Sequence, residues 1–360
     1  MWRKLLRILG FLIGCGVICA YICYASHLAQ AHRAEQRVTR MVVSIADSTE
    51  TRQFASSVQI ANQLKRKGLD MVGKSVDSVD AVKLSNYILR KGFVREADVY
   101  VTYAGEMYVD IKQHKPVARL LCGGLNSYVT SDGDTFSSPQ GAAYYTAVVT
   151  GVYAPLFVTK GRGSVKGCYD SLVAKEDRRL AKLGEDYADL DRLHDEAVAQ
   201  EGALRKDKKR KFLESRASQE QRHVALNIEI AKCKEEQQRI EKRMAQLEQR
   251  RYDIAQRKKK LARKYEDFGN LINFVSEICN DSFWGAEVVQ FVADTTSTGE
   301  ISLRMVPRSG DFVITFGTLA DSDVKMHKLQ EFYKNGLSRF GWERFKSVDL
   351  RYDKQVICTE

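Results

Sequence analysis

The spacing of hydrophobic and polar residues changes several times along the chain, and each change predicts a different element. Residues 41–47 are rich in β-branched side chains, which favours a strand. Residues 57–68 and 78–92 each carry an apolar stripe at helical spacing and end at a glycine. Two strand patterns, 94–104 and 106–121, follow. The predicted order β-α-α-β-β describes a compact α+β domain.

A second strand-rich segment is interrupted by a long helical pattern. Residues 127–157 predict a hairpin with a turn at Asp132-Gly133 and then another strand. Residues 171–268 contain no proline, and their apolar residues recur at steps of four and three. A turn near Gln219, beside residues 214–218, would fold this segment into an antiparallel helical hairpin with arms of similar length. The expected seam residues are Leu183, Tyr187, Leu190, Leu193, Ala197 and Leu204 in the first arm, and Leu226, Ile230, Cys233, Ile240, Met244, Leu247, Ile254, Leu261, Tyr265 and Phe268 in the second.

Strand patterns return after the heptads. Residues 283–294, 299–307 and 311–317 predict three strands, and residues 323–341 predict an amphipathic helix. The final pattern, residues 348–358, alternates between two faces, which predicts one strand with a buried and a solvated side. Its apolar side is Val348, Leu350, Tyr352, Val356 and Cys358, and its polar side is Asp349, Arg351, Asp353 and Gln355.

The last strand is the candidate site. It contains no proline that would block pairing at a sheet edge, so we expect a partner to add a strand to it. The alternative is an interior strand whose residues are simply core. The predicted partner-binding residues are Trp342, Leu350, Arg351, Tyr352, Lys354, Gln355 and Val356.

The N-terminus predicts a membrane anchor. Arg7 is the only charge between Leu5 and Ala25, and about 20 apolar residues span a bilayer as a helix. We therefore expect a cytoplasmic tail (1–4), a transmembrane helix (5–26) and a linker (27–38), with the rest of the chain beyond the membrane. A cleaved signal peptide or a lipoprotein cleavage site are the alternatives, although a signal peptide usually has a shorter apolar stretch.

Motifs for catalysis and metal binding are weak. Residues 68–75 fit the phosphate-loop pattern GxxxxGK[ST], but they follow an amphipathic helix and not a buried strand, which predicts a simple loop between helices. CxxC, HxxxH, HExxH and GxSxG motifs are missing from the sequence. We therefore expect a binding or scaffolding protein with no catalytic residue, metal or cofactor. A disulfide among Cys122, Cys168, Cys279 and Cys358 stays open.

The net charge of +11 raises the question of nucleic acid. Most lysines and arginines of the heptad segment alternate with acidic residues, which is typical of a solvated coiled-coil surface. The cluster 205–211 near the expected tip is the exception. Because the predicted anchor places this tip outside the cytosol, we expect no nucleic-acid partner. An anionic surface such as lipid headgroups or cell-wall polymer remains an alternative.

Several segments, in this order, resemble the FtsQ/DivIB bacterial cell-division proteins. MYVDIKQHKPVARL (107–120) is similar to the strand that closes the family's POTRA domain, and SYVTSDGDTF (127–136) to the hairpin that opens its β domain. VVTG (148–151) resembles the next strand of that domain. The C-terminal run 316–358 is the strongest match and resembles the Bacteroidetes-type branch. The heptad insertion departs from the family pattern.

The residue patterns and the resemblance together predict an α+β fold in four parts. These are a single N-terminal transmembrane helix, a POTRA-like domain (39–121), an antiparallel β domain (122–170 and 269–360) and a long antiparallel coiled-coil hairpin (171–268) inserted into it. The resemblance also implies a non-enzymatic divisome scaffold of the inner membrane at the septum. The implied partners are FtsB/FtsL-like proteins, with FtsK/FtsW-like proteins as further candidates; the POTRA domain is associated with recruitment and the last strand with binding the FtsB-like protein.

Two further hypotheses concern the hairpin. A periplasmic adaptor of a secretion or efflux system also combines one membrane span with a coiled-coil hairpin, but the flanks of this hairpin do not look like two halves of one motif. Arms of about 45 residues would extend about 65 Å. The hairpin tip could therefore contact the cell wall, the outer membrane or a second complex.

Overall fold

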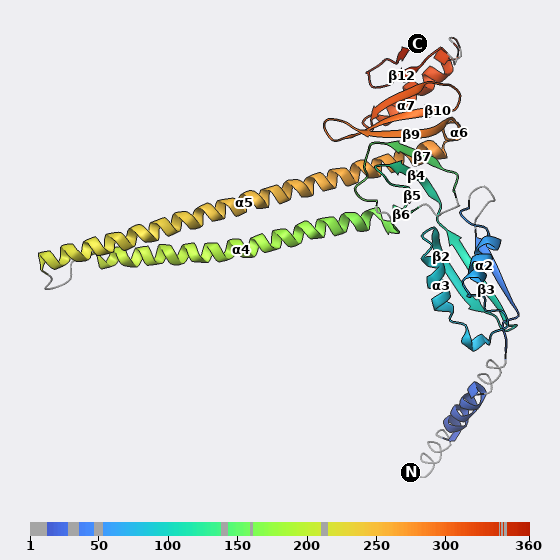
Figure 1. The fold of residues 1–360 in the computed structure, drawn as a ribbon, viewed down its shortest axis with the longest axis horizontal. Helices are drawn as coiled ribbons and strands as arrows, with labels where there is room; N and C mark the ends of the chain where they lie inside the picture. The colour runs from blue at the N-terminus through green and yellow to red at the C-terminus, as the bar shows by residue number, and fades with distance from the viewer. Residues whose placement is uncertain are drawn as a thin grey trace, which may run out of the picture. The chain divides into compact units, whose positions relative to one another are not determined.

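The computed structural model describes residues 13–27, 36–46, 53–137, 143–158, 161–209, 215–337, 339, 341 and 344–360 (Figure 1). The chain divides into two compact units. The first comprises Met1–Ala154, Thr159–Gly163 and Ile272–Glu360, and the second Pro155–Val158 and Ser164–Leu271.

Residues 13–27 form a helix with exposed side chains. Within the described ranges, no helix combines the length and the apolar character needed to cross a bilayer. The predicted span 5–26 begins in residues 1–12, which lie outside the described residues. The transmembrane helix therefore stays a prediction.

The predicted β-α-α-β-β order is confirmed in the first domain. Its elements are β1 (Arg40–Ala46), α2 (Ser57–Arg66), α3 (Ala81–Leu89), β2 (Val94–Val101) and β3 (Glu106–Gln113). The sheet order is β1-β3-β2, with β1 parallel and β2 antiparallel to β3. A short 3₁₀ turn, η1 (Val76–Ser78), precedes α3.

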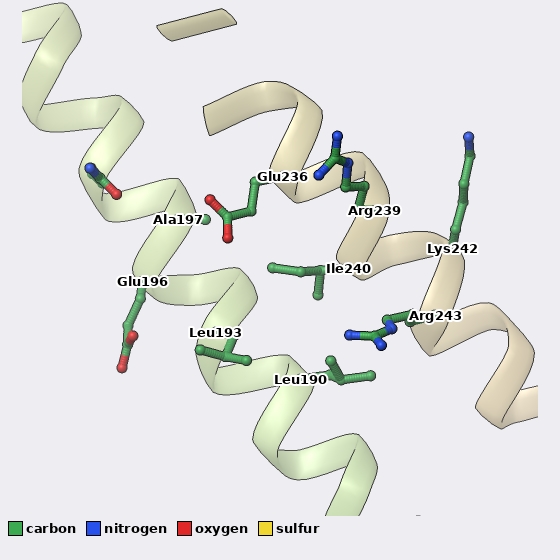
Figure 2. A pocket seen from close by; sticks show the side chains of 10 residues that line it. Leu190, Leu193, Glu196, Ala197, Glu236, Arg239, Ile240, Lys242 and Arg243 are labelled. Carbon is green, nitrogen blue, oxygen red and sulfur yellow. The ribbon is translucent and has the colours of Figure 1, made fainter. Parts of the chain in front are cut away.

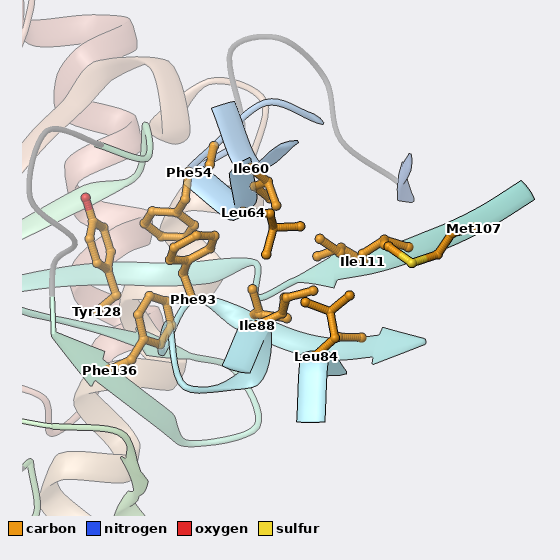
Figure 3. Packing of buried hydrophobic residues seen from close by; sticks show 14 of the residues in the cluster. Phe54, Ile60, Leu64, Leu84, Ile88, Phe93, Met107, Ile111, Tyr128 and Phe136 are labelled. Atoms are coloured by element: carbon orange, nitrogen blue, oxygen red, sulfur yellow. The ribbon is translucent and has the colours of Figure 1, made fainter. Parts of the chain in front are cut away.

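Local sequence explains where the two helices begin. Ser56 and Gln59 form a reciprocal capping box at the start of α2, and the Asp80 side chain accepts a hydrogen bond from the amide of Lys83 at the start of α3. The inward faces of both helices pack on the sheet through buried residues. Figure 3 shows this core; its labelled residues include Ile60, Leu64, Leu84, Ile88, Met107 and Ile111.

A ten-stranded sheet forms the second domain of the first unit. Its strands lie in the order β13-β12-β11-β10-β9-β7-β4-β5-β6-β8. The strand bounds are β4 (Pro116–Cys122), β5 (Ser127–Thr130), β6 (Asp134–Ser137), β7 (Ala147–Gly151), β8 (Gly163–Ser164), β9 (Val288–Thr295), β10 (Ile301–Pro307), β11 (Val313–Thr318), β12 (Ser347–Asp349) and β13 (Ile357–Thr359).

The predicted strand 106–121 is wrong as a single element. It divides at His114-Lys115 into β3, which belongs to the three-stranded sheet, and β4, which belongs to the ten-stranded one. The core continues across this junction, because Phe54 packs edge-on against Tyr128 and Phe136 at ring-centroid distances of 4.9 and 5.4 Å (Figure 3). A chain that changes sheets keeps strand periodicity on both sides of the break, which conceals the break in the sequence.

Helices cover one face of the ten-stranded sheet. They are the last turns of α5 (Arg216–Asn280), α6 (Trp284–Glu287), α7 (Ser322–Glu331) and its π-helical continuation η2 (Phe332–Leu337). Phe274 of α5 lies 4.8 Å from the Phe316 ring of β11, and the ammonium of Lys325 in α7 lies 5.3 Å from the same ring. The predicted inward residues Leu329, Tyr333 and Leu337 are buried.

The second unit contains a long antiparallel helical hairpin built from α4 (Val165–Asp207) and the larger part of α5 (Figure 1). Polar contacts join the two helices at successive levels, and their residue numbers rise along α4 as they fall along α5. These contacts are Asp177–Lys258 at 2.5 Å, Tyr187–Glu248 at 3.3 Å, His194–Glu241 at 3.5 Å and Glu201–Gln237 at 3.1 Å.

The observed hairpin differs from the hairpin predicted from the sequence in two places. Gln219 lies within α5, so the turn predicted at this residue is wrong; α4 ends at Asp207 with 43 residues, and α5 begins at Arg216 with 65. The seam of α5 is buried as predicted at Leu226, Ile230 and other heptad positions. In α4, however, Leu193 is 45% exposed and His194 takes its place in the seam.

The sheet topology explains where the hairpin is inserted. The strands on either side of it, β7 and β9, are parallel neighbours with Val149 opposite Phe291. Parallel neighbours cannot be joined by a tight turn and need a long crossover connection. The hairpin lies within that connection. Gly151 ends β7 at φ 109°, and a β-carbon there would overlap the backbone carbonyl of Ala293 in β9.

Candidate partner-binding edge

The C-terminal residues form a hairpin at one end of the ten-stranded sheet. β12 is parallel to β11 and antiparallel to β13, and β13 stands at the end of the strand order. The predicted single strand 348–358 is therefore wrong: residues 350–356 form a loop between two three-residue strands. Val348 and Leu350 are fully buried, as the alternation predicted.

The structure separates the predicted partner-binding residues into three environments. Leu350 belongs to the core. Arg351, Tyr352, Lys354 and Gln355 are exposed in the loop, and Val356 is half-buried before β13. Trp342 lies outside the described residues. Only Tyr352, which is 45% exposed, presents a large apolar surface among the described members of the set.

Arg351 is already engaged within the chain. Its Nη2 lies 2.6 Å from Oδ2 of Asp349, and its Nε lies 3.0 Å from Oδ1. These hydrogen bonds hold the pKa of the Asp349 carboxyl below its usual value. The arginine stem lies over Gly317, where a β-carbon would come within 2.7 Å of Arg351 Cγ. This side chain therefore stabilises the loop.

Two features fix the course of the loop. The Lys328 ammonium of α7 donates hydrogen bonds to the backbone carbonyls of Leu350 at 3.0 Å and Tyr352 at 2.6 Å. Lys354 adopts φ 54°, a left-handed conformation that turns the chain back towards β13. The exposed side chains of the loop are thus carried on an anchored backbone.

The directions of the backbone amides and carbonyls indicate which residue faces the open edge. The Leu350 amide donates to Thr315 of β11 and the Lys346 carbonyl accepts from Val313 of β11. Because successive strand residues direct their backbone groups to opposite neighbours, Ser347 and Asp349 face β13. Their register partners are Thr359 and Ile357, which consequently bond to β12. Cys358, between those two partners, directs its amide and carbonyl away from β12.

The C-terminus is held in place by its own neighbours. Arg344 Nε lies 2.7 Å from Oε1 of Glu360, and Lys346 Nζ lies 3.0 Å from the Glu360 carbonyl. The hydroxyls of Ser347 and Thr359 lie 2.6 Å apart across the two strands. These contacts keep a three-residue edge strand in register where a chain end would otherwise fray.

The sequence did contain a signal for the loop. Continuing the alternation of Val348, Leu350 and Tyr352 would place Lys354 on the buried face, where a lysine without a partner is costly. That conflict marks the turn. Ile357, Thr359 and the anchoring Lys328 were missed, because nothing in a single strand pattern indicates which residues meet across a hairpin.

Other candidate chemistry finds no support in the described part of the chain. The 68–75 loop joins α2 to η1, and its Gly73 amide donates to the Val38 carbonyl, so the loop packs on its own domain. Metal-ligand clusters of His, Cys, Asp or Glu do not occur among the described residues. All eight cysteines are free thiols, and burial raises the pKa of Cys122 to about 11.

Two family models match the chain. The model described as FtsQ/DivIB, C-terminal related, matches residues 255–359, and the one described as a POTRA-like domain matches residues 36–112. The first covers the end of α5 and the strands from β9 to β13; the second covers β1 to β3. No curated protein sequence matches the chain. Neither family model describes a secretion or efflux adaptor. Together the two matches support an FtsQ/DivIB-type protein and suggest a role in cell division.

Proposed function

We propose that this protein is a single-pass scaffold of the bacterial divisome, anchored in the inner membrane at the septum, which binds FtsB/FtsL-like partners by adding a partner strand to β13. FtsK/FtsW-like proteins are further candidates for recruitment through the POTRA-like domain. The proposal rests on the family matches and on the place of β13 at the end of the sheet, where we infer from the register that the Cys358 backbone faces outward.

The form of the edge favours strand addition. β13 has one neighbour in the sheet of the described residues, and residues 350–360 contain no proline. A strand added there would hydrogen-bond to the amide and carbonyl of Cys358. Side chains beside the added strand would give selectivity; the exposed candidates are Tyr352 and Ile357, which is 38% exposed. Three residues give few backbone bonds, so the side chains must supply much of the affinity.

The membrane part of the proposal rests on the sequence and the family. The apolar residues 5–26 provide the anchor, and FtsQ/DivIB proteins act at the membrane of the division septum. With the N-terminus in the cytoplasm, both the POTRA-like domain and the sheet edge would lie in the periplasm.

The test compares two substitutions at one position. Cys358→Pro removes the outward amide, whereas Cys358→Ala removes the thiol and keeps that amide. Because the amide of residue 358 does not bond to β12, both variants should fold. We expect the full chain with alanine to co-purify with the FtsB/FtsL-like pair of the same genome, and the chain with proline to lose the pair.

Thermal unfolding of both variants supplies the control for folding. A third variant, Ile357→Pro, removes an amide that bonds to β12 and should lower the melting temperature as well as binding. Undiminished co-purification of a stably folded Cys358→Pro chain would refute strand addition at β13. Failure of the unaltered chain to retain the pair would refute the proposed partner.

A further inference from the structure

A groove runs along one flank of the helical hairpin, in the second half of α4 (Figure 2). It has a volume of about 610 Å³. Its apolar floor consists of Leu190, Leu193, Ala197 and Ile240. Leu193 is 45% exposed, although α4 elsewhere places its leucines in the seam. An exposed leucine beside an open groove is typical of a surface that a further helix covers.

The rims of the groove differ in charge. The α4 rim carries Glu196 and the uncharged Gln200, and the α5 rim carries Arg239, Lys242 and Arg243 together with Glu236. Arg239 pairs with Glu235 of its own helix at 2.8 Å. Glu196, Glu236, Lys242 and Arg243 make no hydrogen bond or ion pair to any described residue. Four charged groups around an apolar floor are thus available to a partner.

We propose that the occupant of this groove is the same groove of a second copy of the chain, packed face to face about a two-fold axis parallel to the hairpin. The two hairpins then form a four-helix bundle. Leu193 of each copy is covered by the other, and each acidic α4 rim faces a basic α5 rim. This self-association goes beyond the proposed binding of division partners at β13 and does not depend on it.

The charges select the direction of the axis. An axis parallel to the hairpin places α4 of one copy over α5 of the other without changing level. Glu196 and Arg239 are at one level, because they lie between the Glu201–Gln237 and His194–Glu241 contacts. Glu196 of each copy therefore lies opposite Arg239 of the other copy. An axis across the hairpin would place α4 on α4 and α5 on α5, with like charges opposed.

The size of the groove sets the strength of the contact. Residues 190–200 of α4 extend about 16 Å, and two helices side by side are about 20 Å wide. The groove thus offers about 300 Å² per copy, less than half of the roughly 800 Å² that a stable interface buries on each partner. We expect a dimer that forms at micromolar concentration and dissociates readily. A membrane would raise the local concentration of anchored copies.

The decisive experiment uses two charge variants of the full chain in mild detergent with a reductant. Glu196→Arg makes both rims basic, and Arg239→Glu with Arg243→Glu makes both rims acidic. In each variant alone, like charges would face each other at both α4–α5 contacts of the dimer. We therefore expect each variant to be monomeric by sedimentation equilibrium. An equal mixture opposes unlike charges at both contacts, so we expect dimers to return, and to weaken as salt rises.

An apolar pair of variants supplies the matched control. Leu193 and Val198 are 45% and 46% exposed, but five residues turn α4 by about 140°, so Val198 lies away from the groove. Leu193→Gln should raise the dimer dissociation constant at least about tenfold, and Val198→Gln should leave it unchanged. The proposal would be overturned if the unaltered chain stays monomeric at a concentration on the order of 100 micromolar. A dimer whose dissociation constant is unchanged by Glu196→Arg and by Leu193→Gln would also overturn it.

Discussion

Arg351 holds the carboxylate of Asp349 in a two-pronged contact, with Nη2 2.6 Å from Oδ2 and Nε 3.0 Å from Oδ1. The two residues are next-but-one neighbours, and between them Leu350 enters the core. The contact therefore closes the point where β12 leaves the sheet and the loop begins. A side chain so placed contributes to the fold more than to recognition.

Replacing Arg351 should change stability and spare partner binding. Arg351→Gln leaves Asp349 without its guanidinium, and because the arginine is 56% exposed we expect the free energy of unfolding to fall by only about 0.5–1 kcal/mol. Tyr352→Ala should do the reverse and weaken co-purification without changing stability. Chemical denaturation and co-purification of the two variants separate the effects. A loss of binding with Arg351→Gln at unchanged stability would contradict this assignment.

The same pair predicts acid sensitivity with a definite sign. The hydrogen bond from Arg351 lowers the pKa of Asp349 in the folded chain below its unfolded value of about 3.9. The stabilisation is therefore complete above that value and is lost as the pH falls through the folded pKa. Arg351→Gln should reduce this loss of stability. The measurement is the fall in the free energy of unfolding from pH 5 to pH 3, compared between the variant and the unaltered chain.

His114 should make the first unit sensitive to mild acid. Its buried ring stacks on Phe136 at 5.2 Å, and burial lowers its pKa, an effect that Asp134 at 3.9 Å offsets only in part. Because the folded pKa lies below the unfolded value of about 6.5, stability is complete above pH 6.5 and declines below it. We expect a decline of up to about 1.4 kcal/mol per pH unit, which His114→Phe should abolish.

Gly151 should tolerate no side chain, whereas Gly124 should. Both have positive φ, 109° and 75°. A β-carbon at Gly151 would overlap the carbonyl of Ala293, and one at Gly124 would meet open space. We expect Gly124→Ala to cost about 1 kcal/mol of unfolding free energy, and Gly151→Ala about 3 kcal/mol or more because β7 and β9 must separate. Equal melting temperatures for the two variants would refute this packing.

Shortening the helical hairpin should show whether its length is needed for septation in a chain that still folds. Residues 183–252 are replaced by a short Gly-Ser turn, which joins the two helices at one level. The base stays closed, because Tyr169 and Tyr265 stack at 4.4 Å and Phe157 packs on Tyr265 at 5.7 Å. We expect the shortened chain to fold and to co-purify with the FtsB/FtsL-like pair, but to fail in supporting septation.

Two outcomes decide that experiment. Normal division with the shortened chain would show that the length of the hairpin is dispensable. The matched control is Leu193→Gln, which keeps the full length and alters only the groove. If that variant supports normal division and the shortened chain does not, the failure of septation is caused by the shorter hairpin and not by lost self-association.

Much of the fold follows from local pattern. The β-α-α-β-β order and the α5 seam could be predicted, because amphipathic periods of two and 3.6 residues record which side of an element is buried. The resemblance to the FtsQ/DivIB family followed from short motifs in a fixed order. Hydrophobic spacing also placed Leu329, Tyr333 and Leu337 on the inner face of the helix that covers the sheet.

The candidate site shows the limit of such patterns. The sequence identified residues 348–358 as the important segment, yet alternation describes only the side of a strand and not its neighbour. Whether Arg351 meets a partner or Asp349, and whether residue 358 directs its amide outward, depends on the register between β12 and β13. Contacts from Lys328 to the Leu350 carbonyl and from Arg344 to Glu360 hold the segment in place, and the alternation within residues 348–358 indicates neither of them.

The sequence by itself determined most of the elements and their order, and it indicated the family. Only the tertiary structure decided that one predicted strand changes sheets at His114, that another is a hairpin at the sheet edge, and that Leu193 faces outward beside a groove. The physical reason is that periodicity reports burial, which is a local average. Strand pairing and interhelical packing are made between residues far apart in sequence, and their geometry is fixed only when the chain has folded.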